Sequence, residues 1–309
     1  MSWTRKHLLG LQDLSRDEIQ LILDTAEPCK EIFTRPIKKL PTLRGRVMVN
    51  LFYEPSTRTR TSFELAGKWM SVDVINISTN LSSVAKGESL KDTAKTIEAL
   101  GADFVVIRHY AAGSAKLLAE TVQVSVINAG DGAHEHPTQA LLDLFTIRDK
   151  KGSIEGLHVA IVGDILHSRV ARSNIWGLTK MGAKVTVIGP PTLIPQEIEQ
   201  MGAEVSYDLD EVIPHVDVIN MLRIQKERQV AGLFPSLREY SVLYGLNRRR
   251  LDQARDDVLV IHPGPTNLGV EITSEVAEDP RASIDEQVTN GVAVRMAVLY
   301  LLSGGKDIP

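Results

Sequence analysis

The chain is poor in cysteine, with Cys29 alone among its 309 residues. A single thiol forms no disulfide within the chain and supplies no cysteine-based metal site. Because Cys29 lies in a helical pattern, we expect a buried and inert thiol. These absences remove two common ways of stabilising a fold, so the protein must rely on its hydrophobic cores.

Long apolar runs and a positive net charge are also lacking. No run reaches the length of about 20 apolar residues that a membrane-spanning helix needs, and the N-terminus has no apolar signal core. The formal net charge of −4 argues against nucleic acid as the main partner. The sequence therefore predicts a soluble, cytoplasmic protein that binds neither a membrane nor a nucleic acid.

Short strands alternating with helices are abundant. Runs such as Val47–Tyr53, Phe104–Ile107 and Val159–Val162 are apolar without a two-residue period, which predicts parallel strands buried on both faces. The pattern begins again at His158, after a charged, glycine-containing stretch. We therefore expect an α/β fold with two doubly wound domains, each with a central parallel sheet. The first comprises residues 1–150 with the C-terminal helix, about 285–309, packed back on it, and the second comprises residues 151–284.

The densest polar motif, Ser56–Glu64, lies between a predicted strand and a predicted helix. Free backbone N–H groups and the positive end of the helix dipole favour an anion there. Three hydroxyls add neutral donors: Ser56, Thr57 and Thr59. Arg58 and Arg60 point roughly 200° apart on a helix, and we assign the ligand to Arg58, whose fork suits phosphate oxygens. A simple cap would explain one hydroxyl but not this density, so the motif predicts an oxyanion site.

A second polar motif follows the predicted strand Val124–Asn128. His136 stands at the start of the next helix, where it could polarise a carbonyl oxygen, and Gln139 follows one helical turn later. The alternative for His136 is a plain helix cap. The triplet His134-Glu135-His136 could also suggest a metal site, but no further ligands stand at metal-binding spacing, so we expect no metal.

Three arginines follow other predicted strands: Arg108, Arg169 and Arg223. Arg108 ends a buried strand, so its charge must be paired or meet a ligand, and a structural ion pair remains an alternative. Gln225 lies close to Arg223. Since open α/β sheets bind ligands at the carboxyl ends of their strands, the sequence predicts a strongly anionic ligand set in a cleft between the two domains.

Taken together, these motifs closely resemble the aspartate/ornithine transcarbamoylase family over essentially the whole chain. The most specific matches are residues 56–64, 86–89, 108–109, 136–139 and 262–265. Met221–Arg228 resembles the aspartate branch. The ornithine branch usually has a His-Cys-Leu-Pro loop where this chain has His262-Pro263-Gly264-Pro265, and its Ser-Met-Gly loop has no counterpart here. The resemblance implies carbamoyl transfer from carbamoyl phosphate to L-aspartate, in de novo pyrimidine biosynthesis, with no metal or organic cofactor.

The resemblance also implies roles for matched residues. The phosphate would be held by Ser56, Thr57, Arg58, Thr59 and Arg108. The carbamoyl group would meet Thr59, Arg108, His136 and Gln139. The carboxylates of aspartate would be bound by Arg169, Arg223 and Gln225. Backbone carbonyls near Pro263 and Gly264 would complete the site. Ser82 and Lys86 would reach into a neighbouring subunit's site in a homotrimer, where Lys86 serves both substrates and joins Arg58, Thr59, Arg108 and His136 in catalysis.

Two departures and three alternatives accompany the resemblance. Better-known relatives have Leu at the position of Gly264, and many place an Arg soon after Pro265, where this chain has none. A carbamoyltransferase for another amino acid, such as ornithine, is one alternative, and a non-catalytic phosphate-binding α/β protein is another. A dinucleotide-binding dehydrogenase is disfavoured, because Gly163 is a single glycine where three are needed. The sequence leaves open whether regulatory chains or a dihydroorotase accompany the protein.

Overall fold

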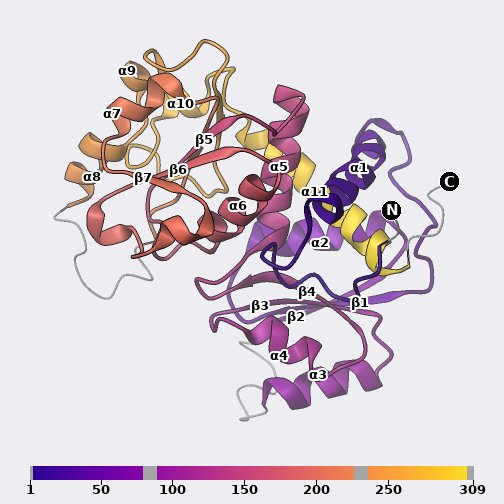
Figure 1. Ribbon diagram of the computed structural model, residues 1–309. Helices are drawn as coiled ribbons and strands as arrows, with labels where there is room; N and C mark the ends of the chain where they lie inside the picture. The colour runs from indigo at the N-terminus through magenta and orange to yellow at the C-terminus, as the bar shows by residue number, and fades with distance from the viewer. Residues whose placement is uncertain (1–2, 79–88, 226–235, 305–309) are drawn as a thin grey trace. The chain divides into compact units, whose positions relative to one another are not determined.

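The computed structural model describes residues 3–78, 89–225 and 236–304 (Figure 1). Contacts divide the chain into two compact units, Met1–Leu142 with Val288–Pro309, and Asp143–Gln287. Each unit contains a parallel sheet with helices around it, so the predicted two-domain α/β architecture is confirmed. The division falls inside helix α5 (Pro137–Lys151), and the domain bounds expected at residues 150 and 284 stay a prediction.

The first unit has four parallel strands in the order β2-β1-β3-β4. Their bounds are β1 Val47–Phe52, β2 Asp73–Ser78, β3 Phe104–His109 and β4 Ser125–Asp131. Among the described residues, the accompanying helices are α1 Arg16–Glu31, α2 Thr57–Trp69, α3 Leu90–Ala99, α4 Ser114–Ala119, the part of α5 up to Leu142, and α11 Ile284–Leu302. Of α11, only the part from Val288 onward belongs to this unit.

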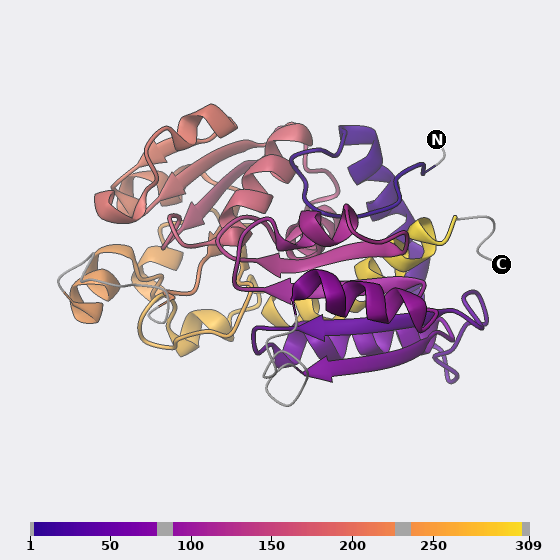
Figure 2. The same ribbon diagram turned by 90° about the horizontal axis from the view of Figure 1, so that it is seen from below.

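Both faces of this sheet are covered. Val49 and Val105 pack in one cluster with Ile97 of α3 and Leu118 of α4, which lie together on one side of the strands (Figure 2). Helix α2 packs closely on the other face, because a Cβ at Gly67 would lie 2.8 Å from the Met48 Cε atom. Alternate residues of each strand thus serve opposite faces.

The second unit has five parallel strands in the order β7-β6-β5-β8-β9. Their bounds are β5 His158–Val162, β6 Lys184–Ile188, β7 Glu204–Ser206, β8 Val218–Met221 and β9 Leu259–Ile261. The accompanying helices are α6 Arg169–Lys180, α7 Leu209–Val212, α8 Leu237–Tyr244, α9 Arg248–Leu251 and α10 Ser274–Ala277. Ala160 and Val162 pack with residues of α7 to α10, whereas Val159 and Ile161 are buried on the opposite face.

Local signals explain several helix starts. Ser15 and Glu18 form the predicted capping box at the start of α1. Ser89 and Ser168 accept backbone N–H groups at the starts of α3 and α6. Cys29 is buried in α1 as expected, and this burial raises the pKa of its thiol to about 12. Within the described part of the chain, no helix combines the length and apolar character that crossing a membrane would require.

Candidate active site

The Ser56–Glu64 motif forms the turn from β1 into α2. Ser56 occupies the N-cap position with an extended backbone (φ −160°), and its carbonyl oxygen accepts the N–H of Arg60 at 3.2 Å. Its hydroxyl makes no capping hydrogen bond within the described structure. The interpretation as a simple N-cap therefore explains where Ser56 lies, but it gives its hydroxyl no role. Thr57 and Arg58 are exposed and Thr59 is buried. The helix start thus presents hydroxyls and a guanidinium beside the N–H groups of its first turn, which suits an oxyanion.

Arg108 lies next to this turn because β1 and β3 are neighbours. The two strands pair Phe52 with Arg108, and the Arg108 carbonyl accepts the Tyr53 N–H at 2.8 Å. The Arg108 Nε atom forms an ion pair with Glu54 Oε2 at 3.4 Å. The structure therefore contains the ion pair that the sequence left open, and it brings Arg108 to the same strand end as the Ser56 turn.

His136 and Gln139 begin α5, after β4. His136 is 4% exposed and Gln139 8%, and the His136 carbonyl accepts the Gln139 N–H at 3.0 Å. Since β4 neighbours β3, the first unit gathers its candidates at the carboxyl ends of three consecutive strands, β1, β3 and β4. The strand order reverses between β1 and β3, which is where open α/β sheets bind ligands.

The loop before His136 is held by Asp131. Its carboxylate accepts the N–H of Gly113 at 2.7 Å and that of Glu135 at 3.1 Å, and contacts His134 Nδ1 at 3.0 Å. Burial raises the pKa of the Asp131 carboxyl, but hydrogen bonds from His134, Asn128 and Gly113 outweigh it, so this pKa lies below its ordinary value. The carboxylate thus stays ionised and fixes the loop.

Glu135 is the part of the His134–His136 triplet that our sequence reasoning did not explain. It is buried, and its carboxylate accepts the backbone N–H groups of Leu11 (2.8 Å) and Gln12 (3.1 Å). The triplet therefore ties the N-terminal segment to the loop, and no metal-ligand cluster is found in the described residues. The signal in the sequence was the acidic residue directly before a candidate histidine, since such a residue needs hydrogen-bond partners if it is buried.

In the second unit, Arg169 is the first residue of α6 and is 3% exposed. The segment leading to it is fixed by Asp164, a buried carboxylate that accepts the His167 N–H at 3.1 Å and contacts His167 Nδ1 at 2.9 Å. Ser168 then caps the helix by accepting the Ala171 N–H at 3.0 Å. These contacts hold Arg169 at the carboxyl end of β5.

Arg223 and Gln225 follow β8, the neighbour of β5. The Gln225 Nε2 atom donates to the His167 carbonyl oxygen at 3.5 Å, so this segment lies beside the one that carries Arg169. The strand order of the second sheet reverses between β5 and β8. Two arginines thus stand at the switch point of the second sheet, as Arg58 and Arg108 do in the first.

Pro263 and Gly264 follow β9, the neighbour of β8. Gly264 has φ +63°, a left-handed conformation that glycine adopts at little cost and leucine does not. Asn267 donates from its Nδ2 atom to the Ile224 carbonyl at 3.5 Å. Asn267 thus links the β9 segment to the β8 segment.

Two predicted residues, Ser82 and Lys86, lie outside the described residues.

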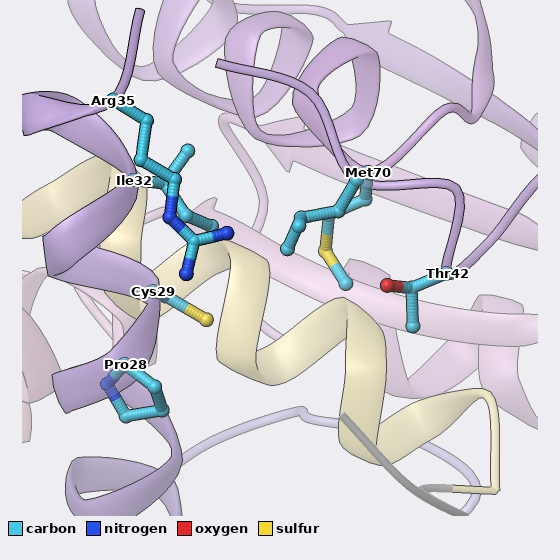
Figure 3. Close-up of a pocket in the computed structure, with 7 residues that line it drawn as sticks. Pro28, Cys29, Ile32, Arg35, Thr42 and Met70 are labelled. Carbon is cyan, nitrogen blue, oxygen red and sulfur yellow. The ribbon is translucent and has the colours of Figure 1, made fainter. Parts of the chain in front are cut away.

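A small pocket drawn in Figure 3 lies apart from the candidates of its own unit. It measures about 40 Å³ and is lined by Pro28, Cys29, Ile32, Arg35, Leu40, Thr42 and Met70. Met70 caps the C-terminal end of α2, whereas the oxyanion donors stand at the N-terminal end of the same 13-residue helix, roughly 20 Å away.

Comparison with known proteins now gives the arrangement a context. Residues 6–149 match the domain described as "Aspartate/ornithine carbamoyltransferase, carbamoyl-P binding domain", and residues 155–302 match "Aspartate/ornithine carbamoyltransferase, Asp/Orn binding domain". The chain is 66% identical over 307 residues to the aspartate carbamoyltransferase catalytic subunit of Moorella thermoacetica, covering 99% of this chain and 100% of the relative. The corresponding subunit of Desulforamulus reducens is 64% identical, with coverages of 99% and 98%.

Solved structures give the same result. The chain is similar to aspartate transcarbamoylase from Trypanosoma cruzi in complex with carbamoyl phosphate and aspartate, with a TM-score of 0.87, 32% identity and coverages of 96% and 97%. Ornithine carbamoyltransferase from Pyrococcus furiosus has the same TM-score at 30% identity, with coverages of 99% and 100%. The fold is therefore common to both branches, and the chain belongs to the aspartate/ornithine carbamoyltransferase family.

Proposed function

We propose that the protein is an aspartate carbamoyltransferase, which converts carbamoyl phosphate and L-aspartate to N-carbamoyl-L-aspartate and phosphate in pyrimidine biosynthesis. The observation that carries this is the placement of oxyanion donors at the switch point of each sheet: Arg58 and Arg108 in one unit, Arg169 and Arg223 in the other. Identities of 60–66% to proteins named aspartate carbamoyltransferase support aspartate as the acceptor.

Carbamoyl phosphate binds to the first unit. Its phosphate lies on the α2 N-terminus, held by Ser56, Thr57, Arg58, Thr59 and Arg108. Its carbonyl oxygen faces Thr59, Arg108 and His136, and its nitrogen faces Gln139. These donors are fixed before the reaction starts, so they stabilise the oxyanion without reorganising.

L-Aspartate binds to the second unit. Arg169, Arg223 and Gln225 hold its two carboxylates, and the carbonyls near Pro263 and Gly264 orient its amine. When the two units close around a common cleft, the amine attacks the carbamoyl carbon. Phosphate then leaves from the tetrahedral intermediate as the C–O bond breaks, and the phosphate takes the proton that the amine loses. Catalysis then rests on holding two anions together and on stabilising the developing charge.

Ser82 and Lys86 enter the active site of a neighbouring chain in a cytoplasmic homotrimer. In this proposal the first domain comprises residues 1–150 with the C-terminal helix, and the second comprises residues 151–284. Lys86 adds a further cation at the point where both substrates are negative. The support for this part is the resemblance at residues 86–89.

The test is a colorimetric assay for carbamoyl aspartate with the purified protein. We expect product formation that saturates with aspartate, and no citrulline when ornithine replaces it. The ornithine alternative is a specific one, because the Pyrococcus furiosus enzyme matches the fold equally well. Citrulline without carbamoyl aspartate would establish that alternative, and phosphate binding without either product would indicate a non-catalytic anion-binding protein.

A further inference from the structure

A chain of buried polar side chains runs behind the β9 segment of the second unit. Glu271, His262 and Gln287 are 0%, 1% and 3% exposed, and Asp143 and Asn174 are 0% exposed. Gln287 Nε2 donates to Asp143 Oδ1 at 2.7 Å, and Asn174 Nδ2 donates to Asp143 Oδ2 at 2.8 Å. Buried polar groups are costly unless hydrogen-bonded, so such a chain indicates a geometric requirement.

The geometric requirement is explained by the backbone N–H groups to which these buried side chains are hydrogen-bonded. Gln287 Oε1 accepts the His262 N–H at 2.9 Å, and His262 Nδ1 accepts the Gly264 N–H at 2.8 Å. Glu271 Oε1 accepts the Asn267 N–H at 2.5 Å. Three N–H groups within six consecutive residues are therefore fixed by buried side chains, on both sides of Pro263 and Gly264.

Glu271 also selects the form of His262 that this arrangement needs. Since His262 Nδ1 accepts a hydrogen bond from Gly264, its proton must reside on Nε2. That nitrogen faces Glu271 Oε1 at 3.3 Å, and a carboxylate there can only accept. The carboxylate thereby holds the ring in the Nε2–H tautomer and leaves Nδ1 available to Gly264.

Glu271 reaches the neighbouring segment through Asn267. Its Oε2 atom accepts from Asn267 Nδ2 at 3.2 Å, and the same nitrogen lies 3.5 Å from the Ile224 carbonyl oxygen. Ile224 stands between Arg223 and Gln225. The buried carboxylate is thus connected to both segments that the proposed function assigns to aspartate.

We infer that Glu271 and His262 are positioning residues for the amino-acid substrate: they fix the carbonyl groups around Pro263 and Gly264 that receive its amine. The inference rests on the proposed function, because it assumes that this segment binds aspartate. The buried residues do not touch the substrate themselves, and they act through the backbone. Their loss should therefore change aspartate binding while leaving the phosphate-binding unit unaltered.

The experiment compares four variants of the full chain with the wild type. Glu271→Ala removes all three acceptor contacts and should raise the KM for aspartate about tenfold or more. Glu271→Gln keeps one oxygen and should recover part of this loss. His262→Asn keeps an acceptor near the Nδ1 position, so it should raise the KM less than His262→Gln, which keeps a donor near the Nε2 position instead.

The matched control is His158→Asn. His158 also forms a side-chain hydrogen bond, to Thr186 at 2.8 Å, but it begins β5 and lies at the amino edge of the same sheet. Its aspartate KM should equal that of the wild type. In every variant, calorimetry with inorganic phosphate should give an unchanged Kd, which separates a positioning effect from a general loss of structure.

Three outcomes decide the question. Aspartate KM values within about twofold of the wild type for Glu271→Ala and both His262 variants would overturn the inference alone. A wild type that makes no carbamoyl aspartate would overturn the proposed function as well. If Glu271→Ala does not fold, the ranking of His262→Asn over His262→Gln still decides, and equal KM values for these two would contradict the positioning role.

Discussion

The two units solve the same problem of placing cations at strand ends, but they support those cations differently. In the first, the supporting groups lie close to the candidates in sequence: Asp131 and Glu135 stand within five residues of His136. In the second, Asp164 and Ser168 also lie close to Arg169, but the supports of the segment that begins at His262 are distant in sequence, at Glu271 and Gln287. The candidate arginines differ too, because Arg58 is exposed and Arg169 is buried.

This difference has a functional consequence. An exposed guanidinium at a helix start can capture a phosphate from solution, whereas a buried one recognises a ligand within an already shaped surface. We therefore expect changes in the first unit to affect turnover, and changes in the second to affect the requirement for aspartate.

The largest expected effect is that of Arg58→Ala, which should lower kcat by about 10²–10³-fold. In the proposed mechanism its charge stabilises the leaving phosphate, on which negative charge grows during the reaction. Steady-state kinetics with both substrates would measure the change. Arg60→Ala is the matched control, since it removes an arginine two residues away on a different side of α2, and equal losses in the two variants would contradict the assignment.

A mixed-subunit experiment would test whether Lys86 of one chain acts in the active site of a neighbouring chain. Lys86→Ala and Arg169→Ala chains should each be nearly inactive. Unfolded and refolded together, they should regain part of the activity, because a chain with its own Arg169 can receive Lys86 from a neighbour. Confirmed mixed trimers that remain as inactive as their parents would mean that Lys86 acts within its own chain or not at all.

Arg223→Ala should raise the KM for aspartate about 10- to 100-fold, because a charge-assisted hydrogen bond to a carboxylate is lost. The Kd for phosphate, measured by calorimetry, should stay unchanged. Arg223→Lys keeps the charge without the two-pronged geometry and should recover only part of the affinity. A fall in kcat with an unchanged KM would reverse the roles that we give to the two units.

A smaller effect concerns the order of binding. Carbamoyl phosphate should bind first and increase the affinity for succinate, an analogue of aspartate, by about fivefold or more. In the proposed mechanism, the first dianion reduces the repulsion among the cations that bind the two substrates, so the second anion binds more tightly. Calorimetric titration of succinate with and without carbamoyl phosphate gives the answer, and equal affinities would exclude an ordered mechanism.

The smallest effect is on stability in mild acid. Burial lowers the pKa of His109 in the first unit and of His158 in the second. Below about pH 6.5 the unfolded chain then binds more protons than the folded one, so stability is fully present above that pH and falls as pH falls through the folded-state values. Urea unfolding at pH 7.5 and 5.5 should show this loss. It should be smaller in His109→Gln and in His158→Gln, and a loss that neither variant reduces would contradict the assignment.

How much the sequence predicted also differs between the units. The Ser56–Glu64 motif, the strands and the residues Arg108, His136 and Arg169 could be identified locally, because strand ends and helix starts are visible in the order of residues. The ion pair of Glu54 with Arg108, the clamp by Glu135 and the chain from Gln287 to Glu271 could not. Each depends on contacts between residues distant in sequence or on neighbouring strands whose order the sequence alone did not specify.

The N-terminal segment has one more consequence, for association between molecules. β4 is an edge strand, and an open edge exposes unpaired N–H and C=O groups to other chains. Leu8 occupies this edge: its N–H donates to the Val126 carbonyl at 3.0 Å, and its carbonyl accepts the Asn128 N–H at 2.9 Å. The segment therefore covers the edge of β4 and prevents edge-to-edge aggregation. We expect a variant that lacks the residues up to and including Leu8 to precipitate.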